Sequence, residues 1–450
     1  MRLIHLARAL FLLPAMAGMF AYGQTFTSLA SFNGVNGEFP CCSLLQATDG
    51  NFYGTTVSGG GGGTVFKVTP AGAITDVYDF SAYNYDGEPG SGLTQGTDGG
   101  LYGTTPTGGF NGYGTAFKIT LSGQLTTLYN FFDNAGANPT GVLALGADGN
   151  FYGETYGLQV YQDSYSGTAF KMTPAGTVTT LYSFNNSNPS GGLVLATDGN
   201  FYGTTTTGGA YGYGAVFRIT PAGVLATLYS FDGTSGIPSA TPLVQANDGA
   251  LYGATSAYEA SAGVVFRITT GGAFTTIHTF DFADGSSPLG LIQATDGQLY
   301  GTTFSGTGPN GYGSVFRMTL DGHLTTLHTF DFTQGAYPVG LVQATNGNFY
   351  GATQEGGPSN DGTIFTVSTG LGPFVRVLPT WGAVGKPVRI LGTNLAGATG
   401  VSFNGTPAVF TIVSATEITT TVPAGATTGK VEVTGSGSAL LSNVAFQVLR

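Results

Sequence analysis

The chain has 450 residues and a formal net charge of −11, with 76 Gly, 41% hydrophobic and 12% aromatic residues. Between residues 24 and 370 there are six basic and 22 acidic residues, a net charge of −16. A surface of that sign repels phosphate backbones, so we expect no nucleic-acid partner. The apolar content indicates a packed core, and frequent glycine is typical of many short strands joined by turns.

The first 23 residues have the pattern of a secretory signal peptide. Arg2 and Arg8 precede an apolar run at residues 9–20, and small residues lead to a cleavage point before Gln24. This run is too short for a transmembrane helix, and no later stretch is long enough. We therefore expect an exported monomer, extracellular or at the cell surface, without a transmembrane segment.

A Tyr-Gly motif recurs seven times, at intervals of 48 to 50 residues. In the copy around Tyr202, apolar segments between turn residues predict four short strands, at residues 193–196, 201–205, 215–220 and 225–231. The first two strands are separated by Asp-Gly in six copies and by Asn-Gly in the seventh, a hairpin signal that suggests type I′ turns. The repeated tyrosines are Tyr53, Tyr102, Tyr152, Tyr202, Tyr252, Tyr300 and Tyr350.

Four strands in each of seven copies predict a seven-bladed β-propeller over residues 24–370. Residues 25–32, "TFTSLASF", match the fourth strand of a copy, whereas the last copy stops after its third strand. We expect the N-terminal strand to complete the last blade. The tight turns would then share one face (the tight-turn face), and the longer second-to-third and fourth-to-first loops the other (the long-loop face).

Residues 373–450 lack the repeat and alternate β-branched residues with Gly, Pro and Asn turns, which predicts a small antiparallel sandwich. This segment resembles an IPT/TIG domain, an immunoglobulin-like fold that commonly serves as an extracellular spacer or binding module. The matching residues are Pro379, Gly382, Gly385, Val388, Gly392, Thr393, Asn394, Leu395, Val401, Phe403, Asn404, Gly405, Val422, Pro423, Gly429 and Val431.

The combined pattern "DGNFYGTT…GG…VFRITPAG" resembles the GloVer tandem repeat of bacterial choice-of-anchor surface proteins. The resemblance implies an exported protein built of repeats and carries no known chemistry.

The third copy departs from the repeat at Glu154, where the other copies have Thr or Ala. Glu154 begins the longest second-to-third loop, which also carries Tyr156, Tyr161, Asp163 and Tyr165. Exposed aromatic faces stack on sugars and carboxylates accept hydroxyl protons, so this loop is a candidate glycan site; drift in a tolerant loop explains it as well. Further candidates on the same predicted face are Tyr83, Tyr85, Tyr258 and Tyr337.

These features favour a non-enzymatic binding or adhesion scaffold for glycan or protein ligands. Two alternatives stay open: a polysaccharide-active hydrolase or lyase, with Glu154 and Asp163 as its carboxylates, and a purely structural spacer of the cell envelope.

The two cysteines, Cys41 and Cys42, are adjacent, which leaves a strained vicinal disulfide or two free thiols. We expect no cofactor and no metal site; weak candidates for calcium are the loops "YDGE" (residues 85–88) and "DFADG" (residues 281–285).

Overall fold

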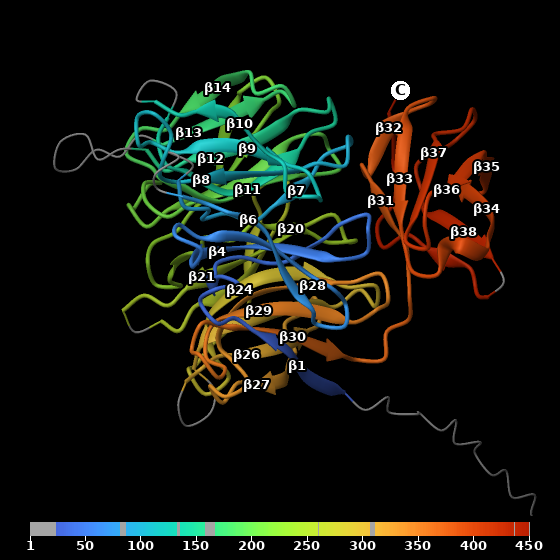
Figure 1. Cartoon of the computed structure of the whole chain (residues 1–450). Coiled ribbons are helices and arrows are strands. Elements are labelled where there is room, and N and C mark those ends of the chain that lie inside the picture. The colour runs from blue at the N-terminus through green and yellow to red at the C-terminus, as the bar shows by residue number, and fades with distance from the viewer. Residues whose placement is uncertain are drawn as a thin grey trace, which may run out of the picture.

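The computed structural model of the protein describes residues 24–81, 87–132, 136–157, 167–259, 261–306, 311–435 and 437–449. The predicted signal peptide lies outside these ranges. The described chain forms a large β-propeller followed by a small β-sandwich, which confirms the predicted all-β fold class (Figure 1). Within these ranges no helix combines the length and the apolar character needed to span a membrane.

Each repeat copy forms a four-stranded antiparallel sheet, and the innermost strand is split in copies 1 and 5. The strands of copies 1 to 4 are β2 (Glu38–Pro40), β3 (Leu45–Gln46), β4 (Phe52–Ser58), β5 (Thr64–Val68) and β6 (Ile74–Asp79); β7 (Thr94–Gln95), β8 (Leu101–Thr105), β9 (Thr115–Ile119) and β10 (Leu125–Asn130); β11 (Pro139–Leu145), β12 (Phe151–Thr155), β13 (Thr168–Met172) and β14 (Val178–Ser183); β15 (Pro189–Leu195), β16 (Phe201–Thr205), β17 (Ala215–Ile219) and β18 (Leu225–Ser230). Those of copies 5 to 7 are β19 (Ile237–Pro238), β20 (Val244–Gln245), β21 (Leu251–Ser256), β22 (Val264–Ile268) and β23 (Phe274–Thr279); β24 (Ser286–Gln293), β25 (Leu299–Ser305), β26 (Ser314–Met318) and β27 (Leu324–Thr329); β28 (Ala336–Gln343), β29 (Phe349–Glu355), β30 (Thr363–Ser368) and β1 (Thr25–Ser31).

The N-terminal strand completes the sheet of the last copy. β1 pairs antiparallel with β30, so that Thr25 lies opposite Ser368. This pairing covers an edge that each strand would otherwise expose. Between copies 3 and 4, a parallel contact of Val142 with Gly192 joins two sheets into one of eight strands.

Glutamine side chains on the inner strands link neighbouring sheets. Gln95 accepts a hydrogen bond at 3.1 Å from the backbone N–H of Thr48 in the preceding copy. Gln46 of the first copy does the same for Thr345 of the last copy, at 3.0 Å, so the sheets close into a ring. Equivalent bonds are made by Gln245, Gln293 and Gln343.

The glycine of the Tyr-Gly motif is required by packing within the sheet. In copy 2, a Cβ on Gly103 would lie 2.6 Å from Cζ of Phe117 and 3.0 Å from Cδ2 of Leu93. Only glycine therefore lets the third-strand phenylalanine close over the second strand.

The Asp-Gly turns differ from the predicted type I′ geometry. Gly50, with φ of 82°, donates its N–H to the carbonyl three residues earlier, and Asp49 has no positive φ. This is a type I turn closed by a left-handed glycine. The aspartate has a side-chain role instead: Asp49 accepts the Tyr53 hydroxyl at 2.8 Å, and Asp98 pairs with Lys118 at 2.6 Å. These bonds give the repeated aspartates a structural role.

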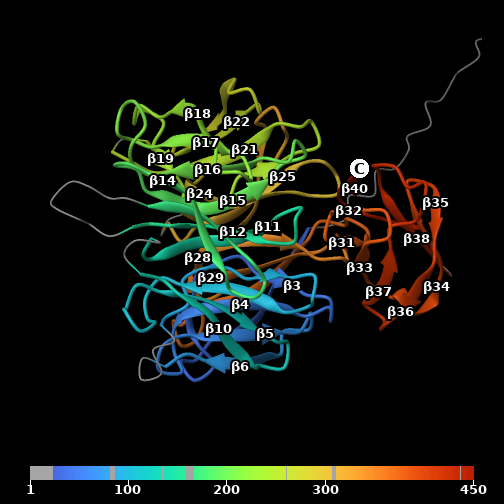
Figure 2. The same cartoon turned by 90° about the horizontal axis from the view of Figure 1, so that it is seen from above.

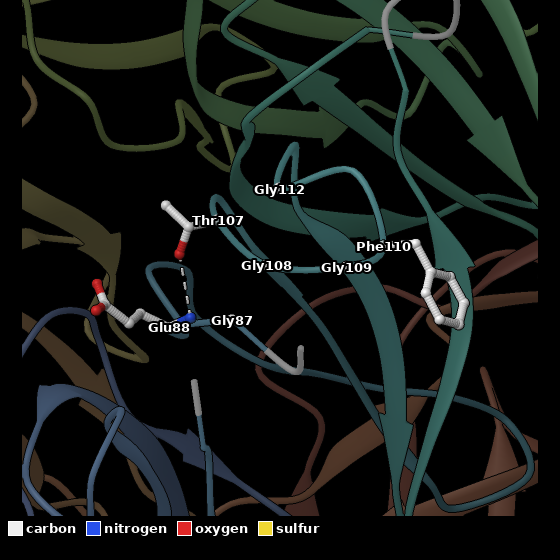
Figure 3. Close-up of a pocket in the computed structure, with 7 residues that line it drawn as sticks. All are labelled: Gly87, Glu88, Thr107, Gly108, Gly109, Phe110 and Gly112. Atoms are coloured by element: carbon white, nitrogen blue, oxygen red, sulfur yellow. Dashed lines mark hydrogen bonds between the residues drawn. The ribbon is translucent and has the colours of Figure 1, made fainter. Parts of the chain in front are cut away.

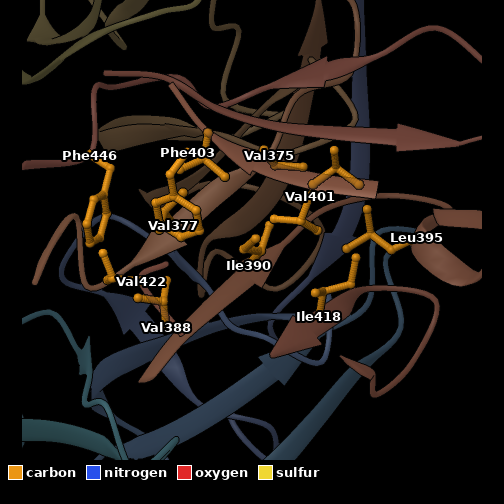
Figure 4. Packing of buried hydrophobic residues seen from close by; sticks show 12 residues of the cluster. Val375, Val377, Val388, Ile390, Leu395, Val401, Phe403, Ile418, Val422 and Phe446 are labelled. Carbon is orange, nitrogen blue, oxygen red and sulfur yellow. The ribbon is translucent and has the colours of Figure 1, made fainter. Parts of the chain in front are cut away.

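The C-terminal sandwich packs two sheets and a short parallel pair around one apolar core (Figure 4). Val377, Ile390, Val401, Phe403 and Phe446 are among the buried residues of that core. Its elements are β31 (Arg376–Leu378), β32 (Trp381–Ala383), β33 (Pro387–Leu391), a 3-10 helix (Leu395–Gly397), β34 (Ala398–Phe403), β35 (Thr406–Ala408), β36 (Phe410–Ile412), β37 (Glu417–Thr421), β38 (Val431–Gly435), β39 (Leu440–Leu441) and β40 (Gln447–Leu449).

The sandwich contacts the propeller beside its tight turns (Figure 2). Thr416 donates to the carbonyl of Thr48 at 3.0 Å, and Arg389 to that of Thr97 at 3.3 Å. Both carbonyls directly precede an Asp-Gly turn. These contacts therefore lie on the tight-turn face, opposite the long loops.

Candidate functional site

The structure describes only some of the predicted site residues, and those it describes come from three copies of the repeat. Tyr83, Tyr85, Tyr161, Asp163 and Tyr165 lie outside the described residues. Four described candidates, Glu154, Tyr156, Tyr258 and Tyr337, belong to copies 3, 3, 5 and 7.

Two of these tyrosines are half-buried rather than exposed to solvent. Tyr337 is half-buried and stacks on Phe304, with ring centroids 5.0 Å apart. Tyr156 is also half-buried, and its backbone N–H donates to the carbonyl of Asn138 at 2.9 Å.

Glu154 is not an exposed loop residue, which corrects the prediction made for it. It lies within β12, is fully buried, and points across the junction between copies 3 and 4. Its Oε2 accepts the backbone N–H of Gly192 at 3.1 Å, while its buried Oε1 has no hydrogen-bond partner. A Cβ on Gly203 would lie 2.8 Å from Oε1, so that glycine makes room for the carboxyl group.

Burial raises the pKa of Glu154 from its ordinary value of 4.5 to about 8, against a small opposing effect of the Gly192 bond. The group is therefore a neutral acid at pH 7. A neutral, buried acid has neither the charge nor the access that a glycan-binding carboxylate needs.

A pocket of about 270 Å³ lies between two loops of the long-loop face, at copy 2 (Figure 3). Glu88, from the loop before the copy, and Phe110, from its second-to-third loop, are both exposed, Phe110 by 82%. The backbone N–H of Glu88 donates to Thr107 at 3.3 Å, and that of Phe110 to Asn130 at 3.2 Å. Gly87 lies against the carbonyl of Thr107 and has φ of 78°, so only glycine allows the two loops to meet.

Copy 5 has a pocket of about 320 Å³ between the equivalent loops. Its second-to-third loop supplies Tyr258 and the exposed Glu259. Tyr258 exchanges two backbone hydrogen bonds with Ser261 and packs edge-on against Tyr213 of copy 4, at 5.7 Å between ring centroids. An aromatic residue and a glutamate are thus among the residues that line each of the two loop pockets.

A third cavity, of about 530 Å³, is lined by residues in or next to the inner strands of all seven copies; we call it the axial cavity. Its described lining residues are small or apolar, with neither a charged nor an aromatic side chain among them. Cys41 and Cys42 are part of this lining, and both are free thiols. Hydrogen bonding from the Cys42 thiol lowers the pKa of Cys41, and the same bond, together with burial, raises the pKa of Cys42.

The calcium candidates gain no support from the described residues. In the "DFADG" loop, Asp284 binds His278 at 2.8 Å and the Asp281 N–H at 3.0 Å, while Asp281 accepts the backbone N–H of Ala283. Residues 85 and 86 of the "YDGE" loop lie outside the described ranges. Across those ranges, no three His, Cys, Asp or Glu side chains are grouped closely enough to hold a metal ion.

The sequence interpretation missed Glu88, Phe110 and Glu259 as partners in pockets. Their signal was available: each lies in a loop whose composition changes from copy to copy, and glycines directly precede Glu88 and Phe110. The pairing of two loops from different parts of the chain was not visible in either loop alone.

Of three similar solved structures, the one with a TM-score of 0.50 supports the fold. A fungal alcohol oxidase of the AA5 family, solved with copper, is 12% identical over 95% of this chain and 99% of its own, with a TM-score of 0.50. A gluconolactonase from Xanthomonas campestris is 10% identical over 75% and 88%, with a TM-score of 0.41. PorZ, a surface component of the type-IX secretion system of Porphyromonas gingivalis, is 13% identical over 89% and 58%, with a TM-score of 0.46. At these identities the likeness concerns the fold alone.

Sequence families identify both parts of the chain. No curated protein matches it. The IPT/TIG domain matches residues 374–448. The Gloeobacter/Verrucomicrobia repeat matches residues 18–194 and 188–406, which together span most of the chain. The chain therefore belongs to the Gloeobacter/Verrucomicrobia repeat family and ends in an IPT/TIG domain.

Proposed function

We propose that the protein is an exported, non-enzymatic scaffold that binds glycans on the long-loop face of its propeller. The observation that carries this proposal is the loop pocket of copy 2, which the exposed Glu88 and Phe110 line from opposite sides (Figure 3). An aromatic face covers the apolar face of a sugar ring, and a carboxylate accepts hydrogen bonds from its hydroxyl groups. The N-terminal signal pattern supports export.

Two further features support this surface as the binding face. The IPT/TIG domain contacts the opposite, tight-turn face, which leaves the long loops clear of it. Exposed aromatic side chains also recur on the long loops, at Phe132, Tyr211 and Phe282 in addition to Phe110. Such exposed aromatics are costly in water and are typical of binding surfaces.

The charge of the propeller favours neutral or cationic glycans. With 22 acidic against six basic residues, residues 24–370 repel uronic-acid or sulfated chains. Glu88 and Glu259 bring the same sign into the two loop pockets. Amino sugars and neutral hexose polymers are therefore the expected ligands.

A glycan array followed by affinity electrophoresis tests the proposal. We expect the wild type to bind neutral or amino-sugar polymers, and Phe110→Ala to weaken binding by roughly 5- to 30-fold, the equivalent of about 1–2 kcal/mol. Glu88→Gln should weaken binding less. Tyr182→Ala is the matched control, because Tyr182 is an exposed aromatic residue on strand β14, outside the long loops, and does not line this pocket.

Three results would count against the proposal. A blank array for the wild type, or binding unchanged in both pocket variants, would refute the glycan site. Release of reducing sugar from a polysaccharide by the wild type would refute the non-enzymatic part.

A further inference from the structure

The axial cavity has a chemistry unlike that of the loop pockets. Glycine, serine, threonine and aliphatic residues form most of its described wall. Its most reactive groups are the thiols of Cys41 and Cys42, which directly follow β2 at the entry to the inner strand of copy 1. Both residues are half-buried, so they are neither sealed in the core nor free on the surface.

The two sulfur atoms face the same junction, between copies 1 and 2. Cys41 Sγ lies 3.1 Å from Oγ1 of Thr55, whose hydroxyl donates to the carbonyl of Ser91 at 2.9 Å. Cys42 Sγ lies 3.9 Å from the carbonyl of Gly90. Both sulfur atoms therefore lie at this junction, on consecutive residues of the chain.

Glycine keeps the space in front of this pair open. A Cβ on Gly92 would lie 3.7 Å from Cβ of Cys42 and 2.9 Å from Val142, so a side chain there would fill the gap. Gly90, Gly92 and both cysteines line the same cavity. Two neighbouring thiols therefore border a space large enough for a small molecule.

We propose that the Cys41–Cys42 dithiol is a binding site for a trivalent, thiophilic metalloid of the arsenic(III) type, which enters through the axial cavity. Soft thiolates select soft acceptors. Sulfur atoms on adjacent residues have a short bite, which suits a pyramidal centre with ligands near right angles. Linear two-coordinate ions need ligands on opposite sides, and a structural zinc needs four donors.

The reaction needs no oxidant or reductant. An arsenoxide, R–As=O, reacts with two thiols: both S–H bonds and the As=O bond break, and two As–S bonds form. The two protons leave with the oxygen as one molecule of water, and arsenic stays trivalent. The third ligand of arsenic, its R group, faces the cavity.

Phenylarsine oxide is the probe, added to the reduced, folded full chain. The mass of the intact chain should increase by one phenylarsenic group. Both thiols should then no longer react with a disulfide reagent. Cys41→Ser and Cys42→Ser should each bind at least roughly tenfold more weakly, because one As–S bond remains. A peptide with the sequence of residues 38–45 should also bind roughly tenfold more weakly than the protein, because the fold holds both thiols in place.

Three outcomes would overturn the proposal: no adduct on the folded chain, thiols that react only after unfolding, or equal affinity of protein and peptide. Glycan binding by the cysteine variants is the control for folding. The glycan affinity of each variant should match that of the wild type. If the wild type binds no glycan, the thermal unfolding of each variant is compared with that of the wild type instead.

Discussion

Glu154 makes the stability of the propeller depend on pH in a direction opposite to that of most carboxylates. Folding raises its pKa from 4.5 to about 8, because burial disfavours the charged form. Below about pH 4.5 the group is protonated in both states and has no effect. Between the two values the unfolded chain ionises while the folded chain holds its proton, so stability falls as pH rises. At about 1.36 kcal/mol for each unit of pKa, the full loss is about 5 kcal/mol by pH 8.

Glu154→Gln keeps the shape of the side chain and removes its titration. Urea unfolding of wild type and variant between pH 4.5 and 8.5, followed by tyrosine fluorescence, should show the variant gaining about 5 kcal/mol relative to the wild type over that interval. The single tryptophan, Trp381, lies in the IPT/TIG domain and reports the unfolding of that domain as an internal reference. Glu88→Gln, at an exposed position, is the matched control and should follow the wild type.

Parallel pH profiles for wild type and Glu154→Gln would refute this reasoning. They would mean that the carboxyl group keeps an ordinary pKa and therefore has access to water. Glu154→Thr extends the test, because it restores the residue that four other copies carry at this position. It should be stabilising at pH 8 for the same reason.

Two further predictions concern the fold. Gly103→Ala should lower the free energy of unfolding by about 1–3 kcal/mol, because its Cβ would lie 2.6 Å from Phe117; Gly271→Ala, with its nearest neighbour at 3.8 Å, should change it by less than about 0.5 kcal/mol in the same urea titration. Arg389→Ala removes the ion pair with Glu417, which is 8% exposed. It should lower the free energy of unfolding by about 1–3 kcal/mol in the transition reported by Trp381. An unchanged midpoint would contradict a stabilising role for this pair.

The repeat made most of the fold predictable. In copy 4, the predicted strand 201–205 matches β16, and 215–220 and 225–231 match β17 and β18 to within a residue. The innermost strand was predicted to begin at residue 193, but β15 begins at Pro189. The difference has a physical cause: residues 189–192 are mostly small and lack the apolar alternation of a strand, yet Pro189 and Ser190 pair with Thr205 and Thr204 of β16. Gly192 also pairs with Val142 of copy 3.

The sites were less predictable because each joins segments that are distant in sequence. Position 154 was correctly identified as a departure from the repeat, but it was assigned to the loop, although the strand predicted at residues 201–205 of copy 4 already covers the equivalent position. β12 extends through Thr155, as β16 extends through Thr205, so Glu154 lies within the strand and its side chain points into the junction between copies. The axial cavity collects residues from all seven copies, about 50 residues apart, and no local pattern announces it.

A departure from a repeat has a different meaning at different places in the blade. At Glu154 the changed residue bonds Gly192, next to the parallel contact between Val142 and Gly192, so it adapts one junction of the ring. On the long loops, Phe110 is 82% exposed, while glycines fix the backbone around it. Burying Glu154 lowers the stability of the folded ring, whereas exposing Phe110 leaves apolar surface in contact with water. A bound ligand can cover only the second of these, which is why we place the proposed glycan site on the loops.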